Sequence, residues 1–544
     1  MKRLSILLVI AMLFTFAIPS FAEEAKTEEK AENAIIKNVI IMIPDGMGVE
    51  GYTLARWFAP EGKFHLDDIA TGFVRTNNAD TPLADSAPAA TAMATGYKSN
   101  TPYIGVYPAK AGMPGTEGFD EAKADMPLAT LLEAAERTGR STGIVSTSNV
   151  NHATPAAFSS HHPSRKELDT LIEQQIYQNM EVVLGAGSNY LEADKRKDGE
   201  DLLSEVKALG YDYFTTRDEL LASKGEKIFG MFQGGAMNYD LDRDEKTEPS
   251  LEDMTRKAIE VLSKNEEGFF LVVEGSEIDW SAHANDPVGL VTDILAYDKA
   301  VKVALDFAKT NSDTVIISAA DHCTGGPTMG NFATSGSYYK TPLENFIKII
   351  KNAKKTGFGA GNELNKDRSN IAEIMNKYFG INDLTAGEIK HIKETEDPQQ
   401  GIGQVISERS FIGWTSNGHV GGDTGLYCYS SNPTVAPLSG TVFNHEIAKY
   451  VEKIMGVDLD ALTEKLFIVA RPALEAKGAK VEWKNVGGDK PNHELIATKD
   501  GKTYRFPVNK NYAYVGEEKV TFDGLTVFNG KAAYLPQSAI NLVK

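Results

Sequence analysis

The sequence predicts an α/β fold with an open, mostly parallel central sheet flanked by helices. Short apolar runs without polar alternation are typical of strands buried on both faces, and three such runs are "NVIIMIPDG", "GFFLVVEG" and "DTVIISAADH". Helical patterns lie between them, at 128–139, 254–265 and 286–309. This alternation of strands and helices is the signature of an open α/β sheet.

The first 22 residues have the features of a secretory signal peptide. They combine a basic pair, an apolar stretch and small residues at Ser20 and Ala22, which fits an A-x-A-like cleavage pattern. A membrane anchor is the alternative, but the apolar run is short and is broken near Pro19. Residues 23–34, charged and poor in large apolar residues, are expected to form an acidic linker. We therefore expect a secreted or periplasmic protein with no stable membrane anchor after signal removal.

The rest of the chain is expected to form one main domain with additions. Residues 35–463 hold the apolar strands and form this domain. Between about 330 and 416 helical patterns lie among polar connections, and we interpret this segment as an insertion over the site face. Runs such as "YRFPV" and "YAYV" predict a small β-rich element over 464–544.

Charge and cysteine content exclude some classes of protein. A formal net charge of −19 argues against nucleic acid as a partner. Cys323 and Cys428 are the only two cysteines, so the chain is no disulfide scaffold. Export would permit one bridge between them, and the sequence leaves their pairing open.

Acidic side chains end the predicted strands. Asp45 and Glu274 each follow an apolar run, and the pair Asp321-His322 follows a third. Ligands of open α/β sheets bind beyond the carboxyl ends of the strands. We therefore expect these side chains to converge on one edge of the sheet.

The segment "EGSEIDWSAH", residues 274–283, carries a candidate metal site. Asp279 and His283 are four residues apart, so on a helix they share one face and both reach one ion; the alternative is a solvated polar turn. "SNGHVGGD" adds His419 among glycines. Carboxylate and imidazole ligands suit zinc, whereas oxygens of Asp, Glu and Thr suit magnesium.

The stretch "ADSAPAATAMATG", residues 84–96, predicts a helix that begins at or near Ser86. Pro88 suits a first helical turn. Backbone N–H groups at a helix start favour an anion, and the small residues that follow allow it to approach closely. The alternative is an N-cap serine before an ordinary alanine-rich helix.

Taken in order, these motifs resemble those of the metal-dependent alkaline phosphatases. The series, which covers most of residues 37–325 and the region of His419, comprises "PDG", "DSAPAATAMATG", "STSNVNHATPAAFSSHHPSR", "EGSEIDWSAH", "ADH" and "GH". The resemblance implies two Zn²⁺ and one Mg²⁺, with these ligands: Asp279, His283 and His419 for one zinc, Asp45, Asp321 and His322 for the second, and Asp45, Thr154 and Glu274 for magnesium. It further implies Ser86 as nucleophile, Arg165 as phosphate-binding arginine, and Asp85 as the acid that orients Arg165.

Two positions depart from part of the family pattern. His152 and Trp280 stand where some members carry Asp and Lys. His152 either binds the third ion, directly or through water, or only packs behind it. An imidazole there predicts a preference for zinc over magnesium at the third site, because magnesium prefers oxygen ligands.

The expected function is hydrolysis of small phosphate monoesters by an exported alkaline phosphatase, through a phosphoserine at Ser86. A phosphodiesterase or sulfatase of the same superfamily is the first alternative. Arg165 argues against a diesterase, because a guanidinium that binds two charged oxygens favours a dianionic monoester. A non-catalytic exported binding protein is the second alternative, and a homodimer is an expectation by resemblance only.

Overall fold

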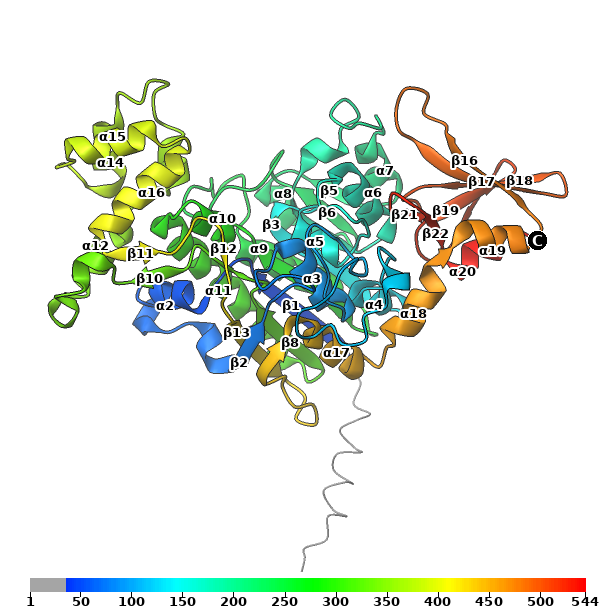
Figure 1. Ribbon diagram of the computed structural model, residues 1–544, viewed down its shortest axis with the longest axis horizontal. Helices are drawn as coiled ribbons and strands as arrows, with labels where there is room; N and C mark the ends of the chain where they lie inside the picture. The colour runs from blue at the N-terminus through cyan, green and yellow to red at the C-terminus, as the bar shows by residue number, and fades with distance from the viewer. Residues whose placement is uncertain (1–35) are drawn as a thin grey trace, which may run out of the picture.

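A computed structural model describes residues 36–544. The predicted signal peptide (1–22) and acidic linker (23–34) lie outside the described residues. The centre of the structure is a ten-stranded sheet with the order β14-β2-β13-β8-β1-β7-β3-β4-β6-β5 (Figure 1). Its strands are β1 (Asn38–Pro44), β2 (Ala70–Arg75), β3 (Ser141–Asn149), β4 (Val182–Ala186), β5 (Asp212–Phe214), β6 (Ile228–Met231), β7 (Phe269–Gly275), β8 (Thr314–Ala319), β13 (Thr424–Ser430) and β14 (Gly440–Phe443).

The sheet is mostly parallel, as predicted. β1 pairs in parallel with β7 on one side and with β8 on the other. β13 is antiparallel to both of its neighbours, β8 and β2. The three apolar runs of the sequence are β1, β7 and β8, and all three are buried along their whole length. The predicted fold class is therefore confirmed.

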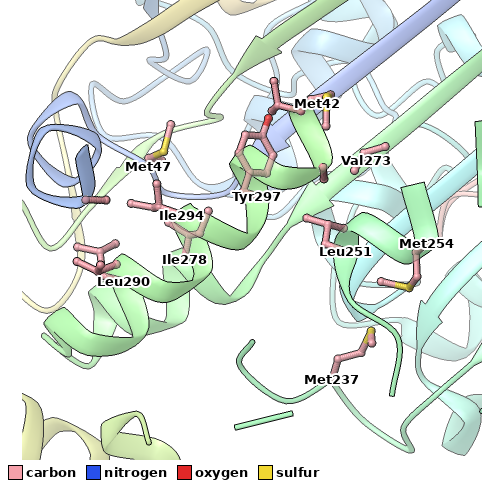
Figure 2. Close-up of a cluster of buried hydrophobic side chains, with 14 of the residues drawn as sticks. Met42, Met47, Met237, Leu251, Met254, Val273, Ile278, Leu290, Ile294 and Tyr297 are labelled. Atoms are coloured by element: carbon pink, nitrogen blue, oxygen red, sulfur yellow. The ribbon is translucent and has the colours of Figure 1, made fainter. Parts of the chain in front are cut away.

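Helices cover both faces of the sheet, and the alternate side chains of β1 pack into two separate cores, one on each face. Ile40 and Met42 pack into one core, whereas Ile41 and Ile43 pack into the other. The first core includes residues of α2 (Val49–Arg56), α9 (Leu251–Leu262), α10 (Glu277–His283) and α11 (Pro287–Thr310). Figure 2 shows part of it, with Met42 beside Tyr297 of α11. The second includes residues of α3 (Ser86–Thr95), α4 (Leu131–Arg137), α5 (Ala153–Ala157), α6 (Leu168–Gln178), α7 (Leu202–Ala208) and α17 (Asn444–Met455).

The segment 330–416 starts and ends at two neighbouring strands of the main domain. β10 (Pro327–Met329) and β11 (Ile412–Trp414) form an antiparallel pair in which Pro327 is opposite Trp414. The helices between them are α12 (Glu344–Asn352), α13 (Gly357–Gly361), α14 (Ile371–Phe379), α15 (Ala386–Glu394) and α16 (Pro398–Arg409). Figure 1 shows this segment at one end of the molecule, and both α16 and α13 contact α11.

A small antiparallel sheet at the other end of the molecule confirms the predicted β-rich C-terminal element (Figure 1). It has its own core, which includes Leu495 and Phe506. Its strands run in the order β16 (Lys480–Asn485), β17 (His493–Lys499), β18 (Lys502–Pro507), β19 (Tyr512–Val515) and β20 (Glu518–Thr521). α18 (Leu459–Leu466) and α19 (Ala470–Ala476) connect it to the main domain.

Two further observations bear on the sequence analysis. Cys323 and Cys428 are both buried free thiols, so no bridge joins them. Within residues 36–544, no helix combines the length and apolar character that a membrane crossing needs.

Candidate active site

The acidic strand ends converge on one edge of the central sheet. The parallel register places Ile43 of β1 opposite Glu274 of β7, so Asp45, just beyond β1, lies next to the carboxylate of Glu274. The next residue, Gly46, must be a glycine for two reasons, its backbone conformation and the lack of space for a Cβ. Gly46 has a φ of 68°, and a Cβ built there would lie 2.6 Å from Asp279 Oδ1.

Asp279, His283 and His419 form the first cluster of potential metal ligands. His283 Nε2 lies 3.3 Å from Asp279 Oδ2 and 3.2 Å from His419 Nε2. The Nδ1 atoms of both histidines lie near backbone oxygens, at 2.8 Å from Asn417 O for His283 and at 2.6 Å from Ala84 O for His419. A carbonyl oxygen only accepts hydrogen bonds, so each Nδ1 carries a proton and each Nε2 is turned toward the other ring. This arrangement fits a cation between the two rings.

Asp45, Asp321 and His322 form a second cluster, which is fully buried. His322 Nε2 lies 3.4 Å from Asp45 Oδ1 and 3.3 Å from Asp321 Oδ2. Burial, and then repulsion from neighbouring carboxylates, raises the pKa of Asp321 to about 6 and that of Asp45 well above its usual range. Burial and then the neighbouring His419 lower the pKa of His322 to about 3, which favours the neutral imidazole that binds metals.

Asp45, Glu274 and His152 form a third cluster. Thr154 lies beside it and donates a hydrogen bond to Asp45 Oδ2 at 3.3 Å. Burial raises the pKa of Glu274, although Ser146 donates a hydrogen bond to Oε2 at 2.5 Å. Burial and then Arg165 lower the pKa of His152 to about 3.

Unpaired buried atoms are a further indication that these clusters bind metal ions. Several buried polar atoms have no hydrogen-bond partner within residues 36–544, among them Asp45 Oδ1, Asp321 Oδ2, Glu274 Oε1 and His152 Nδ1. Buried polar atoms are rarely left without a partner, and buried carboxylates that repel one another need compensating positive charge. Mixed carboxylate and imidazole donors suit zinc in the first two clusters; in the third, the oxygens of Asp45, Glu274 and Thr154 suit magnesium, whereas the nitrogen of His152 suits zinc.

Ser86 lies at the start of α3, next to these clusters. It is the first residue of the helix, and its Oγ lies 3.0 Å from His322 Nε2. Every residue of α3 is buried, and half of its ten residues are alanine. The predicted helix start is therefore correct, and the small side chains let the helix terminus enter the cluster.

Arg165 reaches this region from a loop that lies far along the chain from Asp85. Its Nη1 donates a hydrogen bond to Asp85 Oδ1 at 2.6 Å, and its Nη2 lies 3.1 Å from His152 Nε2. The His152 ring in turn meets Trp280 edge-on, with ring centroids 5.7 Å apart. The structure thus brings together all thirteen residues selected from the sequence.

Thr324 is a site residue that the sequence analysis missed. Its hydroxyl donates to Asp279 Oδ1 at 2.5 Å and lies 3.1 Å from His322 Nδ1. Because its one proton goes to the carboxylate, the hydroxyl accepts from Nδ1–H and turns the His322 Nε2 lone pair toward Ser86. Its position two residues after His322 was the only signal in the sequence.

The family model for alkaline phosphatase matches residues 36–457. The chain belongs to the alkaline phosphatase family. Alkaline phosphatase 3 of Bacillus subtilis is 35% identical over 82% of this chain and 96% of its own length. Repressible alkaline phosphatase of Saccharomyces cerevisiae is 31% identical over 84% of this chain and 87% of its own length. Both relatives are named alkaline phosphatase, and this family member is a phosphoric monoester hydrolase.

Solved structures of the family agree with this membership. The cold-active alkaline phosphatase of Shewanella sp. superposes with a TM-score of 0.65 at 28% identity, covering 77% of this chain and 99% of its own. The alkaline phosphatase of Thermus thermophilus shares the fold, with a TM-score of 0.70 at 24% identity, covering 81% of this chain and 96% of its own.

Proposed function

We propose that this family member is an exported enzyme that hydrolyses phosphate monoesters through a phosphoserine at Ser86, with two Zn²⁺ and one Mg²⁺. The observation that carries the proposal is the position of Ser86. Its Oγ lies 3.0 Å from His322 Nε2, at the start of a buried helix, while Arg165 is oriented nearby by Asp85.

The metal ligands proposed are those of the three clusters. Asp279, His283 and His419 hold one zinc, Asp45, Asp321 and His322 hold the second, and Asp45, Thr154 and Glu274 hold magnesium, with His152 beside them. When bound, zinc ions lower the pKa of coordinated oxygen and stabilise negative charge on the attacking and leaving oxygens.

The side chains of this chain bind and orient the phosphate. The Arg165 guanidinium donates two hydrogen bonds to non-bridging oxygens, and the Asp85 carboxylate fixes its orientation. The backbone N–H groups at the start of α3 add partial positive charge at the same place. Ser86 Oγ then attacks phosphorus as the P–O bond to the alcohol breaks.

Two proton transfers and a water complete the proposed cycle. Ser86 loses its hydroxyl proton on attack, and the departing alcohol oxygen gains a proton. Water then attacks the phosphoserine, the P–O bond to Ser86 breaks, and inorganic phosphate leaves while Ser86 regains its proton. The cycle consumes one ester and one water and yields one alcohol and one phosphate.

The third site is proposed to discriminate between metals. Variants of the alkaline phosphatase from the Antarctic bacterium TAB5, in which a histidine is replaced by Glu or Asp, have Mg bound in the M3 site. In this chain His152 lies in the third cluster, and its imidazole nitrogen favours zinc over magnesium. His152→Asp, combined with Trp280→Lys to balance the new charge, is expected to raise magnesium affinity. If the magnesium dependence of activity across a zinc titration is the same in the variant and the wild type, His152 and Trp280 only pack and do not select the metal.

The test of the proposed function is metal analysis of the purified protein, together with hydrolysis of a monoester, a diester and a sulfate ester that share one leaving group. We expect the monoester to be hydrolysed fastest, and zinc and magnesium to be bound. Faster hydrolysis of the diester or sulfate ester would contradict the proposal. Cell fractionation tests export, and light scattering tests the proposed homodimer.

A further inference from the structure

A pocket of about 570 Å³ opens beside His283. We propose that it holds the alcohol part of the phosphate ester and selects uncharged, planar aromatic leaving groups, such as the nucleoside of a nucleoside 5′-monophosphate. This inference rests on the proposed function, because it assigns the substrate class of the same site. The volume is in the usual range for small-molecule sites.

The position of the pocket agrees with the direction in which the alcohol must leave. In an in-line displacement the leaving oxygen lies opposite the attacking Ser86 Oγ. Ser86 packs against His322, whose side chain is completely buried. His283, in contrast, has 38% of its side chain exposed and lines the pocket. The site is therefore closed behind Ser86 and open at His283.

Aromatic side chains from two parts of the chain form the walls. Trp280 comes from α10 of the main domain, and Phe358 comes from α13 of the 330–416 segment. Phe358 is 39% exposed and packs against Tyr239, with ring centroids 5.4 Å apart. Partly exposed aromatic rings in the lining favour a flat, polarisable ligand.

The polar groups of the pocket favour an uncharged ligand that has hydrogen-bonding edges. Four carboxamides line it: Asn238, Gln399, Gln400 and Asn417. Gln399 is already bonded to Tyr239 and Asp286, and Asn238 Nδ2 donates to Glu248, so the amides of Gln400 and Asn417 are the ones that supply donors and acceptors to a ligand. Asp397 is the one carboxylate, and the described residues that line the pocket include neither Lys nor Arg. A leaving group that carries phosphate would meet no positive charge there and would be disfavoured.

The backbone on both sides of Phe358 is anchored to the main domain. Gly357 N donates to Asp286 Oδ2 at 2.7 Å, and Gly359 N donates to Asp242 Oδ2 at 3.1 Å. A Cβ at residue 359 would lie 2.3 Å from Asp242, so the close approach requires glycine. Phe358 is therefore held at a fixed place in the wall.

The experiment compares 2-phenylethyl phosphate with ethyl phosphate, whose alkyl leaving groups differ in the ring and little in reactivity. We expect wild-type kcat/KM to favour the phenyl ester, and Phe358→Ala to lower kcat/KM for that ester about 5- to 10-fold with less than twofold change for ethyl phosphate. Phe332→Ala is the matched control, since Phe332 belongs to the same segment and is 99% exposed. Adenosine 5′-monophosphate should behave as the phenyl ester does.

Two further measurements separate the ways in which the inference could fail. Adenosine without phosphate should inhibit competitively, and Phe358→Ala should raise its inhibition constant. Gln400→Lys should raise kcat/KM for adenosine 5′-diphosphate relative to adenosine 5′-monophosphate. The pocket assignment would be overturned if the wild type hydrolyses ethyl phosphate but Phe358→Ala lowers kcat/KM equally for both esters. That result would leave the proposed function intact. No hydrolysis of any ester by the metal-loaded wild type would overturn both.

Discussion

His283 Nε2 lies 3.2 Å from His419 Nε2, although the two residues are 136 positions apart in the chain. The rings come from different elements, α10 and β12 (His419–Val420). If both Nε2 atoms are unprotonated, their facing lone pairs repel each other unless a cation lies between them. We propose that a bound metal joins these two segments, so its removal should loosen them.

Removal of metal should lower the thermal stability of the protein as well as its activity. Because a ligand that binds only the folded state stabilises it by mass action, we expect chelation to lower Tm and zinc to restore it. His283→Ala should reduce the rise in Tm produced by zinc, whereas the exposed His391→Ala should keep it. Differential scanning calorimetry measures both, and an equal response in the two variants would exclude His283 as a ligand.

Ser86→Ala should lower turnover by orders of magnitude while metal content stays the same, since the carboxylate and imidazole ligands remain. The measurements are kcat with a monoester and metal analysis of the same sample. A matched control is Ser99→Ala, because Ser99 is also buried but donates to the backbone oxygen of Val106 outside the clusters. Near-normal turnover in Ser86→Ala would rule out a phosphoserine there.

Arg165→Ala should reduce kcat/KM for a monoester much more than for a diester that has the same leaving group. A diester carries less negative charge on its non-bridging oxygens, so it gains less from the guanidinium. Arg165→Lys should recover little of the loss, because an ammonium cannot make the bidentate contact. Equal losses on both substrates would remove the argument against a diesterase.

Asp286→Ala should destabilise the protein and weaken selection of the aromatic ester. The buried carboxylate accepts hydrogen bonds from Val288 N, Gly289 N and Gly357 N, so it both caps α11 and anchors α13. Loss of a buried acceptor leaves these donors unsatisfied, at a cost of about 1–3 kcal/mol each in an unrelaxed site. We expect a lower Tm and a smaller kcat/KM ratio between phenylethyl and ethyl phosphate. An unchanged ratio at lower Tm would show that the anchor does not position Phe358.

Glu136→Gln should stabilise the protein at alkaline pH. Burial raises the pKa of Glu136 to about 8, with Glu181 and Glu133 adding to the shift. A carboxyl that holds its proton more tightly when folded stabilises the fold at low pH, and this contribution is lost as pH rises from the unfolded pKa to about 8. The difference in free energy of unfolding between variant and wild type should thus grow between pH 5 and pH 8, to the order of 1–3 kcal/mol, and then level off. The exposed Glu121→Gln should show no such trend.

Local signals were sufficient to predict the framework of the site. β1, β7 and β8 are continuous apolar runs, and parallel strands bring their carboxyl ends to one edge whatever the intervening sequence. Asp45, Glu274 and Asp321 could therefore be placed together before the structure was considered. The start of α3 at Ser86 was also a local signal, carried by proline and alanine.

Contacts between distant segments could not be predicted from local patterns. β13 runs antiparallel between β8 and β2, and nothing in its composition distinguishes it from a parallel strand. The contribution of Phe358 to the pocket depends on its neighbours' hydrogen bonds to Asp242 and Asp286, more than 70 residues away in the chain. Such pairings are fixed by tertiary packing, which residue spacing does not encode.

The pairing of β10 with β11 has a consequence for how the enzyme can change. Because Pro327 lies opposite Trp414, the chain returns to its point of departure, and a longer or shorter excursion alters closure entropy only slightly. If the proposed pocket selects the leaving group, exchange of residues 330–416 should change substrate preference while the proposed phosphate-binding residues stay the same. Grafting the corresponding stretch of a homologue between these two strands offers a direct route to redesigned selectivity.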